Sequence, residues 1–310
     1  MRDLRGQKMA EIVQRLDLAR LDGGRMHIRG PYLPLFLEHG LASVRAVMDF
    51  PGAELCKGQG SRSVCRFSLI RSGGQGDFFL KRHRHPSRRE QLGEFLRRGR
   101  FLSGARREWE GIWQLRQLGM ATVEPVGFGE LRRWGWEAES FLITEELKGA
   151  ARLTEFIPQQ FPPPLSPSLL AEKRHLLRSL ARLIGSLHGG GWYHRDLYLG
   201  HFFVKPKEGG NYELYLLDLQ RVIRPRWRRR RWMVKDLASL NFSAPFGWFT
   251  ACDRLRFFKE YRQIVRLDRG DKSLIRRILR KSRRIRIHTG RLLERGEIKN
   301  APWGWERDVA

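Results

Sequence analysis

A stripe of apolar residues with the period of an α-helix runs through residues 176–187. Its members lie at i, i+1, i+4, i+7, i+8 and i+11: Leu176, Leu177, Leu180, Leu183, Ile184 and Leu187. This spacing predicts one buried face on a helix of about five turns, which ends at the three glycines 189–191. After a loop, two β-prone runs flank the turn 206–211. Beyond residue 232 the chain is predicted to be helical.

The first half of the chain has the patterns of strands. Residues 64–70 and 78–82 are β-prone and flank a glycine-rich segment, which predicts a hairpin. A helix is predicted over residues 105–118, with Gly119 at its end. A further strand is predicted over residues 140–147.

Together these patterns predict an α+β fold with two lobes. Residues 51–147 are assigned to a β-rich N-terminal lobe with one main helix, and residues 148–310 to a helical C-terminal lobe with basic terminal helices. Residues 1–50 are interpreted as a helical leader. The proline-rich stretch 157–168 is interpreted as the transition between the lobes.

Charge and cysteine content restrict the function. The 60 Lys and Arg residues against 33 Asp and Glu leave a net charge of +27, which predicts a polyanionic partner. Three scattered cysteines argue against a disulfide framework, and there is no CxxC pair for zinc. The N-terminus is too charged for a signal peptide, and no apolar run reaches the roughly 18 residues of a membrane span. We expect a cytoplasmic protein with peripheral membrane contact.

Four chemical features follow one another in a fixed order. Lys81 is on a predicted strand, and Glu108 is in the following helix. The string His194-Arg195-Asp196 follows the long apolar-striped helix, and Asp218 closes a strand. Phosphoryl transfer from ATP uses this order in kinases: a lysine on the phosphates with a carboxylate partner, an aspartate that takes the hydroxyl proton, and an aspartate for Mg²⁺. Glu110 is the alternative partner for the lysine.

The sequence resembles the bacterial lipopolysaccharide core kinases, the Kdo/heptose kinase family with a protein-kinase-like fold. The resemblance covers roughly residues 55–260. It is carried by the strings FFLKRHRHP, ARREWEGIWQLRQLGMATVEPVGFGE, FLITEEL, YHRDLYLGHFFV, LLDLQRV and KDLASLNFSA. It implies ATP and Mg²⁺ as cofactors and a Kdo or heptose hydroxyl as acceptor. It also implies a lipopolysaccharide core or lipid A-linked partner at the inner face of the inner membrane, with no nucleic acid expected.

Two positions depart from the protein-kinase pattern in ways that the family shares. His201 takes the place of the catalytic-loop asparagine, and Asp218 is followed by Leu-Gln instead of Phe-Gly. We predict Asp218 as a metal ligand, and His201 as a second ligand or as a support for Asp196. The short gap from Asp218 to Asp236 favours a small or saccharide acceptor over a protein. Asp236 resembles the buried helix aspartate that anchors the catalytic loop.

Two further segments are predicted to contact the nucleotide. Gly58 and Gly60 lie where kinases have a glycine-rich loop, although an ordinary turn fits as well. The backbone of Glu145 and Leu147 is predicted to meet the adenine edge.

The basic run 224–231 has six arginines in eight residues. We predict that Arg228, Arg229, Arg230 and Arg231 dock an anionic acceptor or leaflet, the alternative being a solvated face. Between residues 254 and 286, fourteen Lys and Arg face three Asp and Glu. The competing functions are a kinase with another acceptor, such as a protein or small metabolite, and a non-catalytic polyanion-binding pseudokinase or nucleic-acid binder. A pseudokinase is disfavoured because Lys81, Asp196 and Asp218 are all present.

Overall fold

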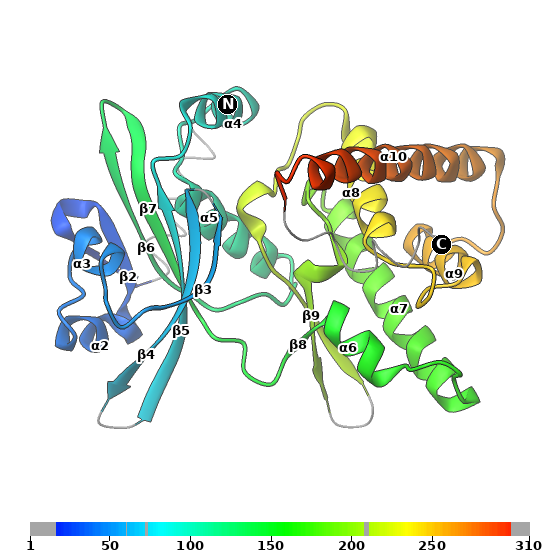
Figure 1. Cartoon of the computed structure of the whole chain (residues 1–310), viewed down its shortest axis with the longest axis horizontal. Helices are drawn as coiled ribbons and strands as arrows, with labels where there is room; N and C mark the ends of the chain where they lie inside the picture. Colours follow the sequence, from blue (N-terminus) through cyan, green and yellow to red (C-terminus); the bar gives the residue numbers. More distant parts are fainter. Residues whose placement is uncertain (1–16, 60, 72–73, 208–210, 299–310) are drawn as a thin grey trace. The chain divides into compact units, whose positions relative to one another are not determined.

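The computed structural model describes residues 17–59, 61–71, 74–207 and 211–298. They form two compact units (Figure 1). The first unit consists of the described residues up to 113 together with 123–147. The second consists of residues 114–122 and those from 148 onward. The second unit therefore resumes at Lys148, where the sequence places the start of the C-terminal lobe.

The first unit is built on a seven-stranded antiparallel sheet with the strand order β1-β2-β6-β7-β5-β4-β3. The strands are β1 (Leu18–Leu21), β2 (Met26–Arg29), β3 (Glu54–Gln59), β4 (Arg62–Arg71), β5 (Gly74–Arg84), β6 (Pro125–Arg133) and β7 (Trp136–Glu145). β4 and β5 form the predicted hairpin, which is confirmed. The strands are longer than expected, because their pairing continues to Arg71 opposite Gly74.

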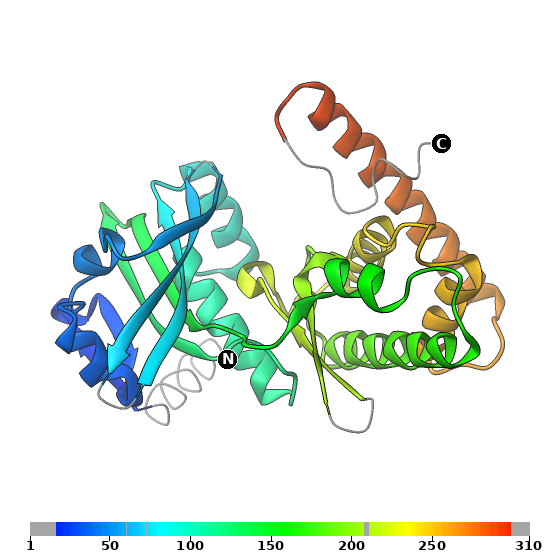
Figure 2. The ribbon, with the colours of Figure 1, turned by 60° about the horizontal axis from the view of Figure 1, so that its bottom comes forward.

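Helices cover both faces of this sheet (Figures 1 and 2). They are α2 (Leu33–Glu38), α3 (Val44–Met48), α4 (Arg88–Arg98) and α5 (Gly104–Gln117), with short 3-10 turns at Asp22–Gly24 and Gly30–Tyr32. Successive side chains of a strand point in opposite directions, so alternate residues of β5 point to opposite faces of the sheet. Phe78 and Leu80 join the apolar core beneath α2 and α3, so Lys81 faces the other way.

The predicted helical leader over residues 1–50 is wrong for the part that the structure describes. Residues 18–29 form β1 and β2, and β2 pairs with β6 to extend the sheet. Residues 33–48 form the two short helices that seal the core. Each strand has only four residues, so its pattern is too short to show a period. Residues 1–16 lie outside the described range.

The second unit is mainly helical, with a three-stranded antiparallel sheet of order β10-β9-β8. Its strands are β8 (Ala151–Arg152), β9 (Phe202–Pro206) and β10 (Tyr212–Leu216), with 3-10 turns η3 (Leu199–His201) and η5 (Leu219–Arg221). Its helices are α6 (Leu153–Gln160), α7 (Pro167–Gly189), α8 (Arg229–Phe242), α9 (Ala251–Arg262) and α10 (Arg269–Glu294).

The predicted apolar-striped helix is α7, and it ends in the glycine run as expected. Leu176, Leu180, Ile184 and Leu187 are buried along it. α7 packs against α9, and α8 packs against α10. The proline-rich stretch 157–168 does not join the lobes, because it runs from the end of α6 to the start of α7 inside the second unit.

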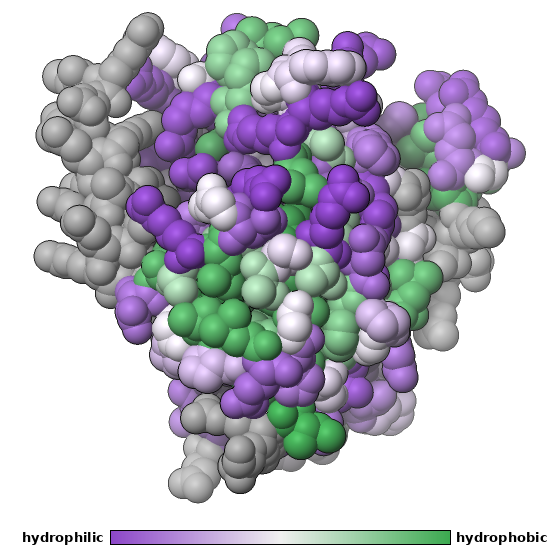
Figure 3. Space-filling model, turned by 90° about the vertical axis from the view of Figure 1, so that its left-hand side faces the viewer, coloured by the Kyte–Doolittle hydropathy of each residue, from purple (hydrophilic) through white to green (hydrophobic). Residues whose placement is uncertain are grey.

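The surface of the first unit on the left of Figure 1, which carries α2 and α3, has hydrophilic side chains around a hydrophobic area (Figure 3). Within the described residues, no helix is both long and apolar enough to cross a membrane.

Candidate active site

Lys81 and Glu108 form an ion pair in the first unit. Lys81 lies on β5, between β4 and β7, and its side chain is 26% exposed, whereas that of Glu108 is 3% exposed. The carboxylate is therefore held inside the unit while the lysine keeps access to solvent. Glu110, the alternative partner, instead contacts Arg100 at 2.9 Å and Arg106 at 3.6 Å.

The position of Glu108 depends on how α5 begins. Both carboxylate oxygens of Glu137, on β7, accept the N–H of Gly104 at 3.0 Å. Ser140, on the same strand, accepts the N–H of Ala105 and donates to Glu137 at 2.6 Å. The free N–H groups of a helix start favour a negative charge. β7 therefore fixes the first turn of α5, and with it the carboxylate that holds Lys81.

The predicted phosphate loop is the connection between β3 and β4. Gly58 is exposed and pairs with Ser63 in the β3–β4 ladder. A Cβ added at Gly58 would meet Leu55 at 3.8 Å, which is an ordinary contact, so no crowding requires glycine there. Gly60 lies outside the described residues.

The predicted adenine-binding segment lies at the end of β7. The N–H of Glu145 donates to the carbonyl of Glu124, and its side chain accepts from Tyr32 at 2.8 Å. The N–H of Glu146 donates to Asp77. Leu147 follows as the last residue of the first unit. These bonds hold the segment in place, and the contacts of Glu145 and Leu147 with adenine stay predictions.

In the second unit, the buried carboxylate of Asp236 organises the HRD loop. It accepts the backbone N–H groups of His194 at 2.8 Å and of Arg195 at 2.7 Å, and it contacts His188 at 3.3 Å. His194 Nε2 donates to the carbonyl of Leu217 at 3.0 Å, which ties the loop to the segment that carries Asp218. The structure thus brings the predicted anchor residue to the loop. Arg195 has φ of +74° and a buried side chain. The bonds from the N–H groups of His194 and Arg195 to Asp236 stabilise this unusual backbone conformation.

Asp196 lies between two cations that were not predicted from the sequence. Its Oδ2 accepts from Arg221 at 2.5 Å, and its Oδ1 accepts from Lys235 at 3.1 Å. Lys235 also donates to the carbonyl of Arg195. The available signals were positional only: Arg221 follows Asp218 by three residues, and Lys235 directly precedes Asp236.

His201 and Asp218, the two predicted metal ligands, lie next to each other. His201 Nδ1 donates to the carbonyl of Asp196 at 2.8 Å, so the ring directs Nε2 at Asp218 Oδ2, 3.5 Å away. Burial lowers the pKa of His201 against the opposing charge of Asp218, which favours the neutral ring. In the neutral ring, the lone pair of His201 Nε2 faces Asp218 Oδ2, and neither atom can donate a proton to the other. A cation bound by both atoms would remove the repulsion between them.

The chemistry of this pair suits Mg²⁺ with Asp218 as the main ligand. Mg²⁺ prefers oxygen ligands, keeps several waters and binds through one or two carboxylates plus phosphates. Asp218 is half exposed, so water and phosphate oxygens have room beside it. Among the residues that the structure describes, no group of three or more His, Cys, Asp or Glu side chains forms a metal cluster.

The four predicted docking arginines lie at the start of α8. Arg228 precedes the helix with φ of +60°, and residues 229–231 form its first turn, all of them exposed. Cations are unfavourable at a helix N-terminus, where the helix dipole is positive. An anion bound at the start of α8 would therefore offset the positive charge of the arginines and of the helix dipole.

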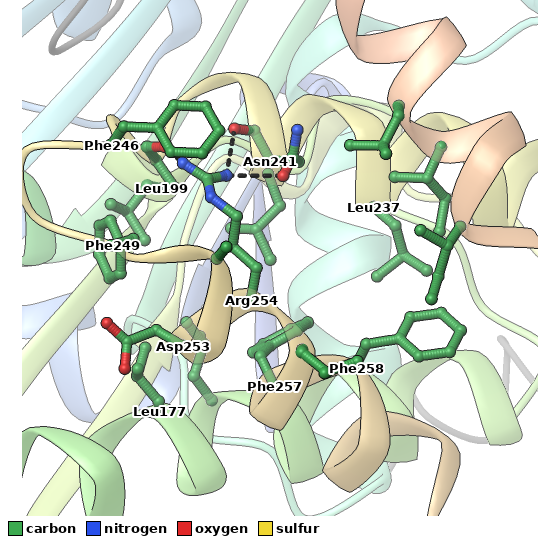
Figure 4. A pocket seen from close by; sticks show the side chains of 18 residues that line it. Leu177, Leu199, Leu237, Asn241, Phe246, Phe249, Asp253, Arg254, Phe257 and Phe258 are labelled. Carbon is green, nitrogen blue, oxygen red and sulfur yellow. Dashed lines mark hydrogen bonds between the residues drawn. The ribbon is translucent and has the colours of Figure 1, made fainter. Parts of the chain in front are cut away.

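The second unit also contains an apolar pocket of about 340 Å³ between α7, α8, α9 and α10 (Figure 4). Leu180, Leu240 and Ile278 are among the aliphatic residues that line it, and Phe246 lies at its exposed edge. Arg254 donates to both oxygens of Asn241, at 3.1 and 2.6 Å, and holds one wall. No pattern in the sequence predicts this pocket.

Comparison with known proteins agrees with the resemblance. Residues 78–267 match the model of the lipopolysaccharide kinase (Kdo/WaaP) family. The lipopolysaccharide core heptose(I) kinase WaaP of Pseudomonas aeruginosa is 34% identical over 232 residues, which cover 71% of this chain and 85% of that protein. The enzyme of the same description from Escherichia coli K12 is 32% identical over 239 residues, covering 74% of this chain and 86% of the relative.

A solved structure, described as WaaP in complex with acyl carrier protein, is similar to this chain with a TM-score of 0.63 and 28% identity. The match covers 84% of this chain and 99% of that one. The predicted α+β, two-lobed, protein-kinase-like fold is thereby confirmed.

Proposed function

The chain belongs to the lipopolysaccharide kinase (Kdo/WaaP) family and is a phosphotransferase that acts on a sugar hydroxyl of the lipopolysaccharide core, and from that premise we propose a heptose residue as its acceptor. The observation that supports this choice is the agreement of both relatives, each described as a heptose(I) kinase. ATP is the expected phosphoryl donor of the family.

In the proposed reaction, the acceptor oxygen forms a bond to the γ-phosphorus of ATP while the bond from that phosphorus to the β–γ bridging oxygen breaks, and ADP leaves. Asp196 accepts the hydroxyl proton and orients the oxygen for attack. Lys81, fixed by Glu108, offsets charge on the α- and β-phosphates. The remaining site residues position these groups, which is the main source of rate in phosphoryl transfer.

Asp218, with His201 beside it, would hold Mg²⁺. When bound, the ion offsets negative charge on the phosphates of the nucleotide. Asp236 contributes only through the loop, because its carboxylate is fully buried on the N–H groups of His194 and Arg195.

The acceptor is tested with a set of core saccharides. Purified enzyme is incubated with ATP and either a Kdo-only saccharide or one that also carries heptose, and the phosphate is located by mass spectrometry. We expect phosphate on heptose only. Phosphate on Kdo would overturn the choice of acceptor and keep the enzyme class, and transfer to neither would reject a core-sugar acceptor.

We further propose that the enzyme works in the cytoplasm at the inner face of the inner membrane, where its glycolipid acceptor is presented. The exposed arginines 228–231 support this, since each cation near an anionic leaflet contributes about 1 kcal/mol of binding free energy.

An acyl carrier protein is a second proposed partner. The similar solved structure is a complex with that protein. The apolar pocket of the second unit has the size of a ligand site and the chemistry to take an acyl chain. We propose that the acyl group occupies this pocket between α7, α8, α9 and α10.

This partner is tested by titrating acylated and unacylated acyl carrier protein into the enzyme. We expect Ile278→Trp, which fills the pocket, to weaken only the acylated complex. Val265→Trp is the matched control, because Val265 is 84% exposed in the same unit and does not line the pocket. Equal binding of both forms by the Ile278 variant and by wild type would contradict the proposal.

A further inference from the structure

The two cations on Asp196 are held very differently. Lys235 lies on α8 next to the anchor Asp236, and its ammonium bonds both Asp196 and the carbonyl of Arg195. These two bonds engage two of its three N–H donors, and its side chain is only 27% exposed. Lys235 could leave Asp196 only if the loop that contains Arg195 and Asp196 also moved.

Arg221 is the exposed member of the pair. It lies in η5, three residues after Asp218, and its side chain is 45% exposed. In the part of the chain that the structure describes, its contact with Asp196 is the one hydrogen bond that its guanidinium donates. A guanidinium has five N–H donors, and it matches the planar, two-oxygen geometry of a carboxylate or phosphate. Most of its binding capacity is therefore still available.

The oxygen that Arg221 occupies is one that the chemistry needs. Oδ1 of Asp196 accepts from Lys235, which is also tied to the loop, and Oδ2 accepts from the more exposed Arg221, so Oδ2 is the oxygen whose partner can leave when the acceptor hydroxyl arrives. An acceptor that brings its own anionic group offers Arg221 an equivalent partner. The arginine could then move without leaving a charge unpaired, which is the main cost of breaking such a contact.

We propose that Arg221 is the acceptor-binding residue of the site: it pairs with Asp196 in the free enzyme and moves to a carboxylate or phosphate of the saccharide when the acceptor hydroxyl reaches Oδ2. Lys235 stays on Oδ1 as a positioning residue. This inference rests on the proposed function, and it adds a requirement for an anionic group near the phosphorylated hydroxyl.

The experiment measures both binding and turnover for Arg221→Gln. Heptose-containing core saccharide is titrated calorimetrically, and KM for acceptor and for ATP is measured separately. Three forms of the saccharide are used: unmodified, with its Kdo carboxyls reduced to alcohols, and with its phosphates removed. Arg182→Gln is the matched control, because it removes an exposed arginine that pairs with Glu260 in the same unit.

We expect Arg221→Gln to weaken binding of unmodified saccharide and raise acceptor KM about tenfold or more, as for the loss of one charged hydrogen bond. ATP KM and the control should not change. The form of the saccharide that lacks the anion should bind wild type as weakly as it binds the variant, which identifies the group that Arg221 contacts. Lys235→Met should instead lower kcat about tenfold or more and leave saccharide binding intact.

Other outcomes separate the two claims. Wild-type activity with unchanged binding in Arg221→Gln would overturn the inference and leave the proposed function standing. A rise in ATP KM alone would also overturn it, by assigning Arg221 to the nucleotide. Wild-type protein that neither binds nor phosphorylates the saccharide would reject both.

Discussion

At the scale of single residues, the second unit contains two ion pairs that join the same two helices but differ in burial. Lys173 on α7 contacts Asp253 on α9 at 3.0 Å and the carbonyl of Trp248 at 2.6 Å, and both side chains are less than 10% exposed. Arg182 and Glu260 pair at 2.6 Å on the surface of the same helices. The buried pair should matter far more for stability, because removing one partner leaves a charge without compensation.

Asp253→Asn should therefore lower the unfolding free energy by about 3–5 kcal/mol, whereas Glu260→Gln should cost about 0–1 kcal/mol. Burial alone would raise the pKa of Asp253, but the bonds and charge of Lys173 hold it below the ordinary value of 3.8. As the pH falls, Asp253 is protonated in the unfolded state before it is protonated in the folded state. The stability that the Lys173–Asp253 pair contributes is therefore fully present above pH 3.8 and is lost as the pH falls through the lowered pKa of Asp253. Urea unfolding of both variants and wild type from neutral pH to pH 3 provides the measurement. Equal losses in the two variants would contradict the account.

The site residues that could be predicted from the sequence are those whose types follow one another in the order that kinases use. Lys81, Glu108, Asp196 and Asp218 were chosen that way, and the structure pairs the first two. Arg221 and Lys235 were missed because they meet Asp196 only through the fold, 25 and 39 residues further along the chain. Nothing in a local pattern distinguishes them from the many other basic residues of a chain with a net charge of +27.

At the scale of elements, α5 carries Glu108, and two side chains of β7 hold its first turn. Glu137→Ala would leave the N–H of Gly104 without its partner. We expect a loss of about 1–2 kcal/mol of stability, as for other lost helix caps, together with weaker ATP use because Glu108 is less firmly placed against Lys81.

Ser87→Ala is the matched control for this prediction. Ser87 accepts the N–H of Glu90 at the start of α4, in the same unit, so its loss should cost similar stability without reducing activity. Both variants are assayed for ATP KM and kcat at a temperature at which they are folded. Equal activity of the two variants would show that the start of α5 does not position Glu108.

Element prediction from the sequence succeeded where patterns were long. The β4–β5 hairpin, α5 and α7 each extend over ten or more residues, enough for a period to appear. β1 and β2 have four residues each, and β2 joins β6 about a hundred residues later, so their place in the sheet is a property of the tertiary fold. The proline-rich stretch was misassigned because proline marks a break between elements and does not distinguish a loop inside a lobe from one between lobes.

At the scale of the whole molecule, the net charge of +27 makes attraction to anionic surfaces a general property. Replacing Arg228, Arg229, Arg230 and Arg231 by Gln tests whether docking is localised at the start of α8. We expect weaker binding to anionic vesicles at low salt and a smaller difference at high salt, because exposed charges are screened beyond about 8 Å at physiological ionic strength. ATP KM should not change. Co-sedimentation with vesicles at two salt concentrations is the measurement.

The control replaces four exposed arginines of α10 by Gln: Arg276, Arg277, Arg283 and Arg284. It removes the same charge from a different helix of the same unit. If the α10 variant loses vesicle binding and the α8 variant keeps it, the docking surface is α10 and the run 228–231 is a solvated face.

In the proposed reaction, Asp196 takes the proton of a core sugar hydroxyl during transfer from ATP. This role is tested most directly by transfer of radiolabelled γ-phosphate to the heptose-containing core saccharide, with wild type and Asp196→Asn compared side by side. Asparagine keeps the shape of the side chain and removes the base, so kcat should fall by at least about 10² while the affinity for ATP changes little. Transfer by Asp196→Asn within a few-fold of wild type would contradict the account.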